Sequence, residues 1–218
     1  MPTVLDRDGI WAAIDAQRTQ VADLLDELSD DEWARPSLCQ GWTVRDVAAH
    51  LTLQQIPWGQ AIVFMLKYRG DTGRAIDETA RERAAALSTQ QIAAEIRAMV
   101  GSCRHNAGVT HRETLIDALV HGQDIALPLG RTLTIDVLAA AEATNRMWTM
   151  RFPPPFPATR TMKSFRLVAT DTDWSAGSGP EVHGPIVAIM LVSSGRTVAL
   201  PHLSGPGAAT LTARLRAA

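Results

Sequence analysis

The sequence predicts a mainly α-helical protein, in which a helical bundle precedes a small α+β part. Three observations predict this class. Apolar residues recur every three or four positions in five segments of the first 151 residues. A proline-rich segment, Phe152–Pro157, then interrupts the helical pattern. Beyond it, the apolar residues fall into runs as short as those of β-strands.

Amphipathic helices account for the first part of the chain. A short turn or helical piece is expected at Ser29–Trp33, and residues 71–86, which are charged and alanine-rich, predict a loop plus part of a helix. Pro57 should kink or divide the second long helix, whose apolar pattern resumes in Ala61–Tyr68. The long helices are expected from about Leu5 to Leu28, from Thr43 past His50, from Ser88 or Thr89 to about Gly101, from Thr110 to Leu127 and from Thr134 to about Arg151.

Shorter elements follow the proline-rich segment. They are a strand at Ser164–Thr170, a second strand at Glu181–His183, an apolar helix at Pro185–Val192, a third strand at Thr197–Leu200 and a last helix at Gly207–Leu215. This mixture is typical of a small α+β unit. The predicted domains are therefore a bundle at 1–151, a linker at 152–161 and a C-terminal domain at 162–218.

Composition excludes several classes of protein. The 218 residues are 46% hydrophobic and 20% charged, as in an ordinary globular protein. A formal net charge of −2 without a block of like charges argues against a general nucleic-acid or anionic-membrane binder. The longest apolar runs are too short to cross a bilayer, and the first residues lack the apolar core of a signal peptide. We expect a cytoplasmic protein in which Cys39 and Cys103 are free thiols.

Three polar residues lie beside apolar helical stripes. Thr43 is a good N-cap with Asp46 three residues on, so His50 falls in the helix that they start. Asp117 and His121 are four residues apart and share one helix face. Two helices that offer these groups would form a three-ligand site for zinc or a similar ion, with one position open as in catalytic sites. The alternative is that the histidines are ordinary hydrogen-bonded core residues.

Several of these segments together resemble the mycothiol-dependent maleylpyruvate isomerase family. The matching segments are Leu28–Trp33, Pro36–Leu51, Leu119–Gly130, Ala169–Trp174, Gly179–Pro185 and Gly195–Arg196. The resemblance implies a DinB-like four-helix bundle followed by a small sterol-carrier-like C-terminal domain. It also implies that His50, Asp117 and His121 bind the metal. The family's acidic ligand is commonly Glu, so the shorter Asp117 is a departure from its pattern.

The resemblance also implies a chemistry. A zinc-bound thiol loses its proton at neutral pH and becomes a nucleophile for a small electrophile. The family implies mycothiol as the thiol cosubstrate and an isomerase or transferase reaction. Two alternatives stay open: a metal-dependent hydrolase that uses metal-bound water, and a non-catalytic metal-dependent binding or sensing protein. The expected partners are the electrophile and the thiol, without nucleic acid or membrane, and a homodimer is possible.

Other polar residues have predicted roles around this centre. Asp124 lies one turn after His121 and is expected to orient it, as part of the catalytic machinery, or to face the bundle rim. Arg196 is expected to bind a carboxylate of the substrate or the thiol, with a solvated surface arginine as the alternative. Cys39 is expected to pack rather than react. His105 and His111 are spare ligand candidates, and Trp42 and Trp174 are expected to pack at the helix corner and in the small domain.

Overall fold

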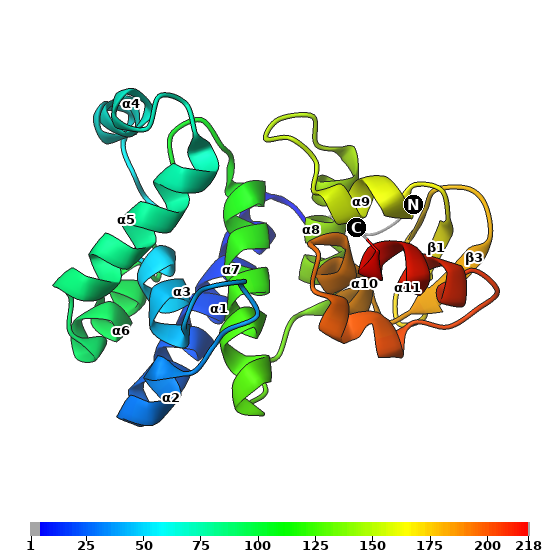
Figure 1. Cartoon of the computed structure of the whole chain (residues 1–218), viewed down its shortest axis with the longest axis horizontal. Helices are drawn as coiled ribbons and strands as arrows, with labels where there is room; N and C mark the ends of the chain where they lie inside the picture. Colours follow the sequence, from blue (N-terminus) through cyan, green and yellow to red (C-terminus); the bar gives the residue numbers. More distant parts are fainter. Residues whose placement is uncertain (1–4, 218) are drawn as a thin grey trace. The chain divides into compact units, whose positions relative to one another are not determined.

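A computed structural model describes residues 5–217 of the chain. Contacts divide the described residues into two units, one of residues 9–134 and one of residues 135–217 together with 5–8. The first unit is helical, and the second combines helices with a small sheet, so the predicted mainly α fold class is confirmed (Figure 1).

The first unit comprises seven α-helices and a short 3₁₀ turn. They are α1 Arg7–Asp26, α2 Asp30–Ala34, α3 Val44–Leu51, α4 Trp58–Lys67, α5 Thr72–Ala86, α6 Thr89–Ala98, α7 His111–Ala126 and η1 Leu127–Leu129. Helix α3 packs against α2, α5, α6 and α7. Its buried Val44, Val47 and Leu51 contribute to the core of the unit, which confirms the apolar stripe predicted for this helix.

Helix α5 covers residues 72–86, so the predicted helix in this region is confirmed and the predicted loop is wrong. Asp71 caps α5 through a hydrogen bond to the backbone of Arg74. Only Ala80 and Ala84 of this helix are buried. Its other residues are partly or fully exposed, so the segment needs no apolar stripe and shows no apolar periodicity although it is a helix.

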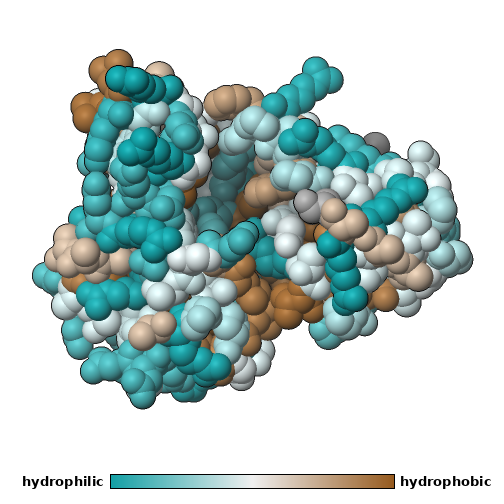
Figure 2. All heavy atoms as spheres, in the orientation of Figure 1, coloured by the Kyte–Doolittle hydropathy of each residue, from teal (hydrophilic) through white to brown (hydrophobic). Residues whose placement is uncertain are grey.

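Helix α4 is apolar but lies on the surface of the first unit. Pro57 occupies its N-cap position, so this proline divides the chain between α3 and α4 as predicted. None of the residues of α4 is fully buried. Trp58, Met65 and Leu66 are more than half exposed, and Figure 2 shows hydrophobic atoms gathered where α4 lies.

The second unit combines a three-stranded sheet with helices. Its elements are α8 Val137–Thr149, α9 Pro157–Met162, β1 Arg166–Ala169, β2 Ser175–Ala176, β3 Glu181–Gly184, α10 Ile186–Ser193, η2 Thr197–His202 and α11 Ala208–Arg216. Strand β1 is central, antiparallel to β2 and parallel to β3, with Leu167 opposite Ala176 and Val182. Helix α10 is almost entirely buried and packs against α8, α9 and η2.

One predicted strand is wrong. Thr197–Leu200 forms part of the 3₁₀ helix η2, and the third strand is instead the short β2. The burial of two adjacent side chains, Ala199 and Leu200, explains why this segment is a 3₁₀ helix and not a strand. A strand would place two successive side chains on opposite faces.

The contacts divide the chain between residues 134 and 135, whereas the sequence predicted that the bundle ends at residue 151. The predicted domain boundaries stay a prediction. Helix α8 belongs to the second unit, since it packs against α10 and its Trp148 contacts the buried Trp174 at 6.2 Å between ring centroids. Helix α9 begins at Pro157, inside the predicted linker, because proline is favoured at the first position of a helix. Within residues 5–217, each helix is too short or too polar to cross a bilayer.

Candidate metal centre

His50, Asp117 and His121 come together in the first unit. The Nε2 atom of His50 lies 3.2 Å from Oδ1 of Asp117, and the Nε2 atom of His121 lies 3.4 Å from the same oxygen. The centroids of the two imidazole rings are 4.9 Å apart. The three residues predicted from the sequence as a group are therefore neighbours in the structure.

Local sequence explains how the helices present these groups. The Thr43 hydroxyl and the Asp46 carboxylate form a complete capping box that starts α3, and His50 lies in the last turn of this helix. Helix α7 packs against α3 and carries Asp117 and His121 on consecutive turns. The side chains are mostly buried but keep access to solvent, with 15% exposure for His50, 16% for His121 and 28% for Asp117.

The environment of Asp117 favours its charged form. Burial acts to raise the pKa of Asp117, but the adjacent His50 and His121 and a hydrogen bond from Gln54 together lower this pKa well below its usual value. Asp117 is therefore a carboxylate at neutral pH, as a metal ligand must be.

The donor set fits a zinc-like ion. Two imidazole nitrogens and one carboxylate oxygen are ligands that zinc accepts at about 2.0–2.2 Å. A tetrahedral arrangement at that bond length separates neighbouring ligand atoms by about 3.3 Å. The observed separations of 3.2 and 3.4 Å are close to this value. Three protein groups leave a fourth position for a bound small molecule.

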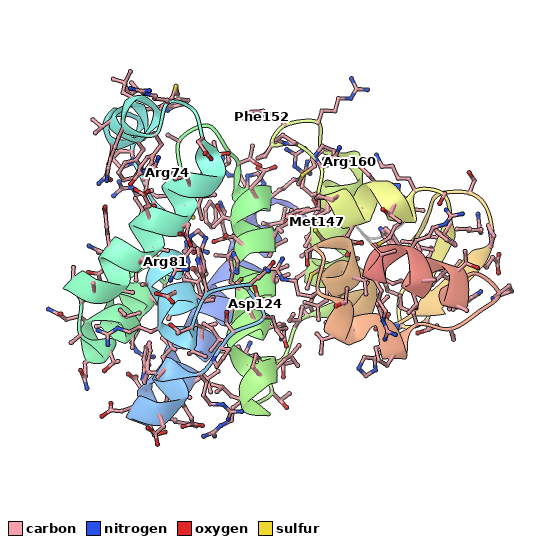
Figure 3. The ribbon with its side chains drawn as sticks, in the orientation of Figure 1. Arg74, Arg81, Asp124, Met147, Phe152 and Arg160 are labelled. Atoms are coloured by element: carbon pink, nitrogen blue, oxygen red, sulfur yellow. The ribbon has the colours of Figure 1, made fainter. Side chains whose placement is uncertain are left out.

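Asp124 contacts the ring nitrogen of His121 that lies away from Asp117. Asp124 is fully buried on α7 (Figure 3), and its Oδ2 lies 2.8 Å from Nδ1 of His121. A carboxylate accepts a hydrogen bond here, so Nδ1 carries the proton and Nε2 is left as the acceptor that faces Asp117 and His50. Asp124 is buried and therefore does not lie on the bundle rim, and its orienting role stays a prediction.

Cys39 takes part in the same network. Its Sγ donates a hydrogen bond to Oδ2 of Asp124 at 3.1 Å and lies 3.5 Å from Nδ1 of His121. The half-buried thiol packs against the core as predicted and is also hydrogen-bonded to the carboxylate that contacts His121. Cys39, His121 and Asp124 also form a second group of potential ligand atoms.

Other candidates lie outside the cluster. The ring of His111 contacts Trp11, and Nδ1 of His105 lies 3.1 Å from the carbonyl oxygen of Asn106. Neither belongs to a group of potential metal ligands among residues 5–217. Arg196 lies in the second unit, where its Nη1 donates to the carbonyl oxygen of Ser194 at 2.7 Å. Carboxylate binding by Arg196 stays a prediction.

Two further residues complete the surroundings. Trp42 is buried and donates from Nε1 to Oδ1 of Asp77, and its ring centroid lies 5.4 Å from that of His50. This agrees with its predicted packing at the helix corner. Gln54, which sequence reasoning missed, donates from Nε2 to Oδ2 of Asp117 at 2.7 Å. The sequence gives no reliable sign of this contact. Gln54 is four residues after His50, but α3 ends at Leu51, so the two residues do not share a helix face.

The fold and this cluster define a class of protein. It is a helical bundle in which two histidines and an aspartate lie close together, as the ligands of a metal ion do. The sequence profile of the mycothiol maleylpyruvate isomerase N-terminal domain matches residues 14–105. This segment of the chain is similar to that family, so the predicted family resemblance is confirmed. The match includes His50 and ends before Asp117 and His121.

Solved structures extend the comparison to both units. Two crystal structures of mycothiol-dependent maleylpyruvate isomerase, one of them of a histidine-to-alanine mutant, match the chain with TM-scores of 0.57 and 0.59. Each is 14% identical in sequence, and each alignment covers 88% of this chain and 90% of the other. The similarity establishes a shared fold. The search of curated proteins finds no match.

Proposed function

We propose that the protein is a metal-dependent, mycothiol-dependent isomerase or transferase that acts on a small electrophile. The observation that carries this proposal is the convergence of His50, Asp117 and His121, whose potential ligand atoms all lie within 4.8 Å of one another. The matched N-terminal domain family and the similar crystal structures of mycothiol-dependent maleylpyruvate isomerase support mycothiol as the thiol and maleylpyruvate as the first substrate to test.

The residues of this chain have distinct tasks in the proposed reaction. His50, Asp117 and His121 hold the metal, which we propose to be Zn²⁺. When bound, the metal supplies Lewis acidity and lowers the pKa of a coordinated thiol. Asp124 keeps the proton of His121 on Nδ1, which leaves Nε2 to the metal. The negative charge of Asp117 offsets part of the charge of the ion.

Purified protein should contain about one divalent ion per chain. Two neutral imidazoles and one carboxylate give such an ion three ligands at a single point. Elemental analysis after purification without chelators measures the content, and dialysis against Zn²⁺ followed by desalting tests reloading. Protein that stays metal-free after Zn²⁺ is offered would contradict the proposal.

Turnover should depend strictly on an added thiol. The assay follows maleylpyruvate with mycothiol present or absent, with metal-free protein as the control. Loss of activity without either component supports the proposal. Turnover without thiol identifies the metal-dependent hydrolase instead. Metal binding without turnover of maleylpyruvate or other small electrophiles identifies the binding or sensing protein.

A further inference from the structure

We infer that Gln54, supported by the buried Arg18, is a positioning residue that fixes the orientation of the Asp117 carboxylate. This inference rests on the proposed function, because it concerns how Asp117 meets the metal. Gln54 lies in the turn between α3 and α4 and is 3% exposed. Its amide holds one oxygen of Asp117, and the other oxygen faces the two histidines.

The two oxygens of Asp117 have separate partners. Oδ2 accepts a hydrogen bond of 2.7 Å from Nε2 of Gln54. Oδ1 is the oxygen that lies 3.2 Å from His50 and 3.4 Å from His121. A carboxylate on a short side chain rotates easily about its last bond, because this torsion has a broad and roughly twofold preference. The hydrogen bond from Gln54 favours the rotation that presents Oδ1 to the metal position.

The chemistry of the neighbours explains why residue 54 is a glutamine. The guanidinium of Arg18 only donates hydrogen bonds, and the carboxylate of Asp117 only accepts them. A side chain between them must therefore accept on one side and donate on the other. Gln54 does both, since its Oε1 accepts from Nε of Arg18 at 3.3 Å while its Nε2 donates to Asp117.

Arg18 is itself buried and hydrogen-bonded to other parts of the first unit. It is 2% exposed, and its Nη1 donates to the carbonyl oxygens of Met99 at 2.8 Å and Ser102 at 3.2 Å. The same nitrogen lies 3.2 Å from Oδ1 of Asp15 on α1. These contacts link Asp117 through Gln54 and Arg18 to α1 and to the segment that follows α6.

The hydrogen bond from Gln54 matters more for an aspartate than it would for a glutamate. Asp has one methylene fewer than the Glu that is common in the family, so a correct orientation must bring its oxygen to the metal. An outer hydrogen-bond partner of a metal ligand typically changes metal affinity by about 10–100-fold. We expect Gln54 to contribute within this range.

The test replaces Gln54 by methionine, which has a similar length but cannot hydrogen-bond to Asp117 as an amide does. Gln55→Met is the matched control, because Gln55 lies in the same turn and its buried Nε2 has no hydrogen-bond partner among residues 5–217. Competition with a chromogenic chelator measures Zn²⁺ affinity. We expect affinity about 10–100-fold weaker in Gln54→Met and unchanged in Gln55→Met.

A second measurement separates orientation from folding. Co²⁺ in place of Zn²⁺ reports coordination through its visible absorption, which should change in Gln54→Met and stay the same in Gln55→Met. If Gln54→Met does not fold, Gln54→Asn keeps an amide but is too short to reach both neighbours, and it should also bind Zn²⁺ more weakly.

The outcomes distinguish this inference from the proposed function. A wild-type protein without metal affinity would contradict the proposed function. A wild-type protein that binds Zn²⁺, together with folded Gln54 variants of equal affinity and an unchanged Co²⁺ spectrum, would overturn only the role of Gln54. An equal loss in Gln55→Met would overturn it as well, because the effect would then not depend on the contact with Asp117.

Discussion

His50→Ala and His121→Ala are expected to lose metal binding and activity while the protein still folds. Each change removes one of three ligands, so metal affinity should fall by at least the roughly 100-fold that an outer hydrogen-bond partner can cause. Most of the stability of the first unit comes from its apolar core and not from these polar groups. Circular dichroism and metal titration measure the two effects separately.

The two variants should differ in stability. Asp124 is fully buried and loses one hydrogen-bond partner in His121→Ala but not in His50→Ala. A buried group that loses a partner typically costs about 1–3 kcal/mol, so His121→Ala should unfold at the lower temperature. His105→Ala, at an exposed histidine outside the cluster, is the control and should retain the metal. If both site variants unfold, the centre is structural and the catalytic interpretation fails.

Asp117→Asn should bind metal much more weakly than the wild type, whereas Asp117→Glu should keep it. The amide of asparagine has the shape of the carboxylate but not its charge, so the ion loses a charged ligand. The decrease should be at least about 10–100-fold, since removing a ligand affects the ion more directly than removing an outer partner. Glutamate keeps the charge and restores the ligand that is common in the family. Competition with a chromogenic chelator measures both variants.

A stability measurement without metal is the control for this pair. The metal-free Asp117→Asn protein should remain folded, because Asp117 is partly exposed and lies at the edge of the core. Zn²⁺ affinity in Asp117→Asn equal to that of the wild type would show that Asp117 is not a ligand. The third ligand would then have to be another group, because His105 and His111, the spare candidates from the sequence, lie outside the cluster.

Features of the fold that depend on local sequence were predictable. Thr43 and Asp46 placed the start of α3 correctly, and Thr110 placed the start of α7, because a capping residue acts on the few backbone groups that follow it. The grouping of Asp117 with His121 follows from helical spacing alone. Their meeting with His50 needed the packing of α3 against α7, and the sequence indicated this only through the family motifs.

Features that depend on tertiary contacts were not predictable. Strand β2 has two residues, too few for an alternating pattern, and forms because Ala176 pairs with Leu167 of β1. The segment at η2 contains residues that favour strands, but the surrounding core buries two neighbours in succession. Gln54 and Cys39 act through partners 63 and 85 residues away, so local spacing contains no sign of either contact.

The division of the centre between two helices has a consequence for folding. Asp117 and His121 are neighbours whenever α7 is helical, so a partly folded chain already has two of the three metal ligands. His50 is 67 residues from Asp117 in sequence, and closing a loop of that length costs conformational entropy that only the assembled bundle offsets. A metal ion that binds these two ligands also stabilises incompletely folded chains, and this reduces the net effect of the metal on the stability of the folded protein. Of the free energy of metal binding, only the part that His50 adds contributes to the packing of α3 against α7, beside the apolar core.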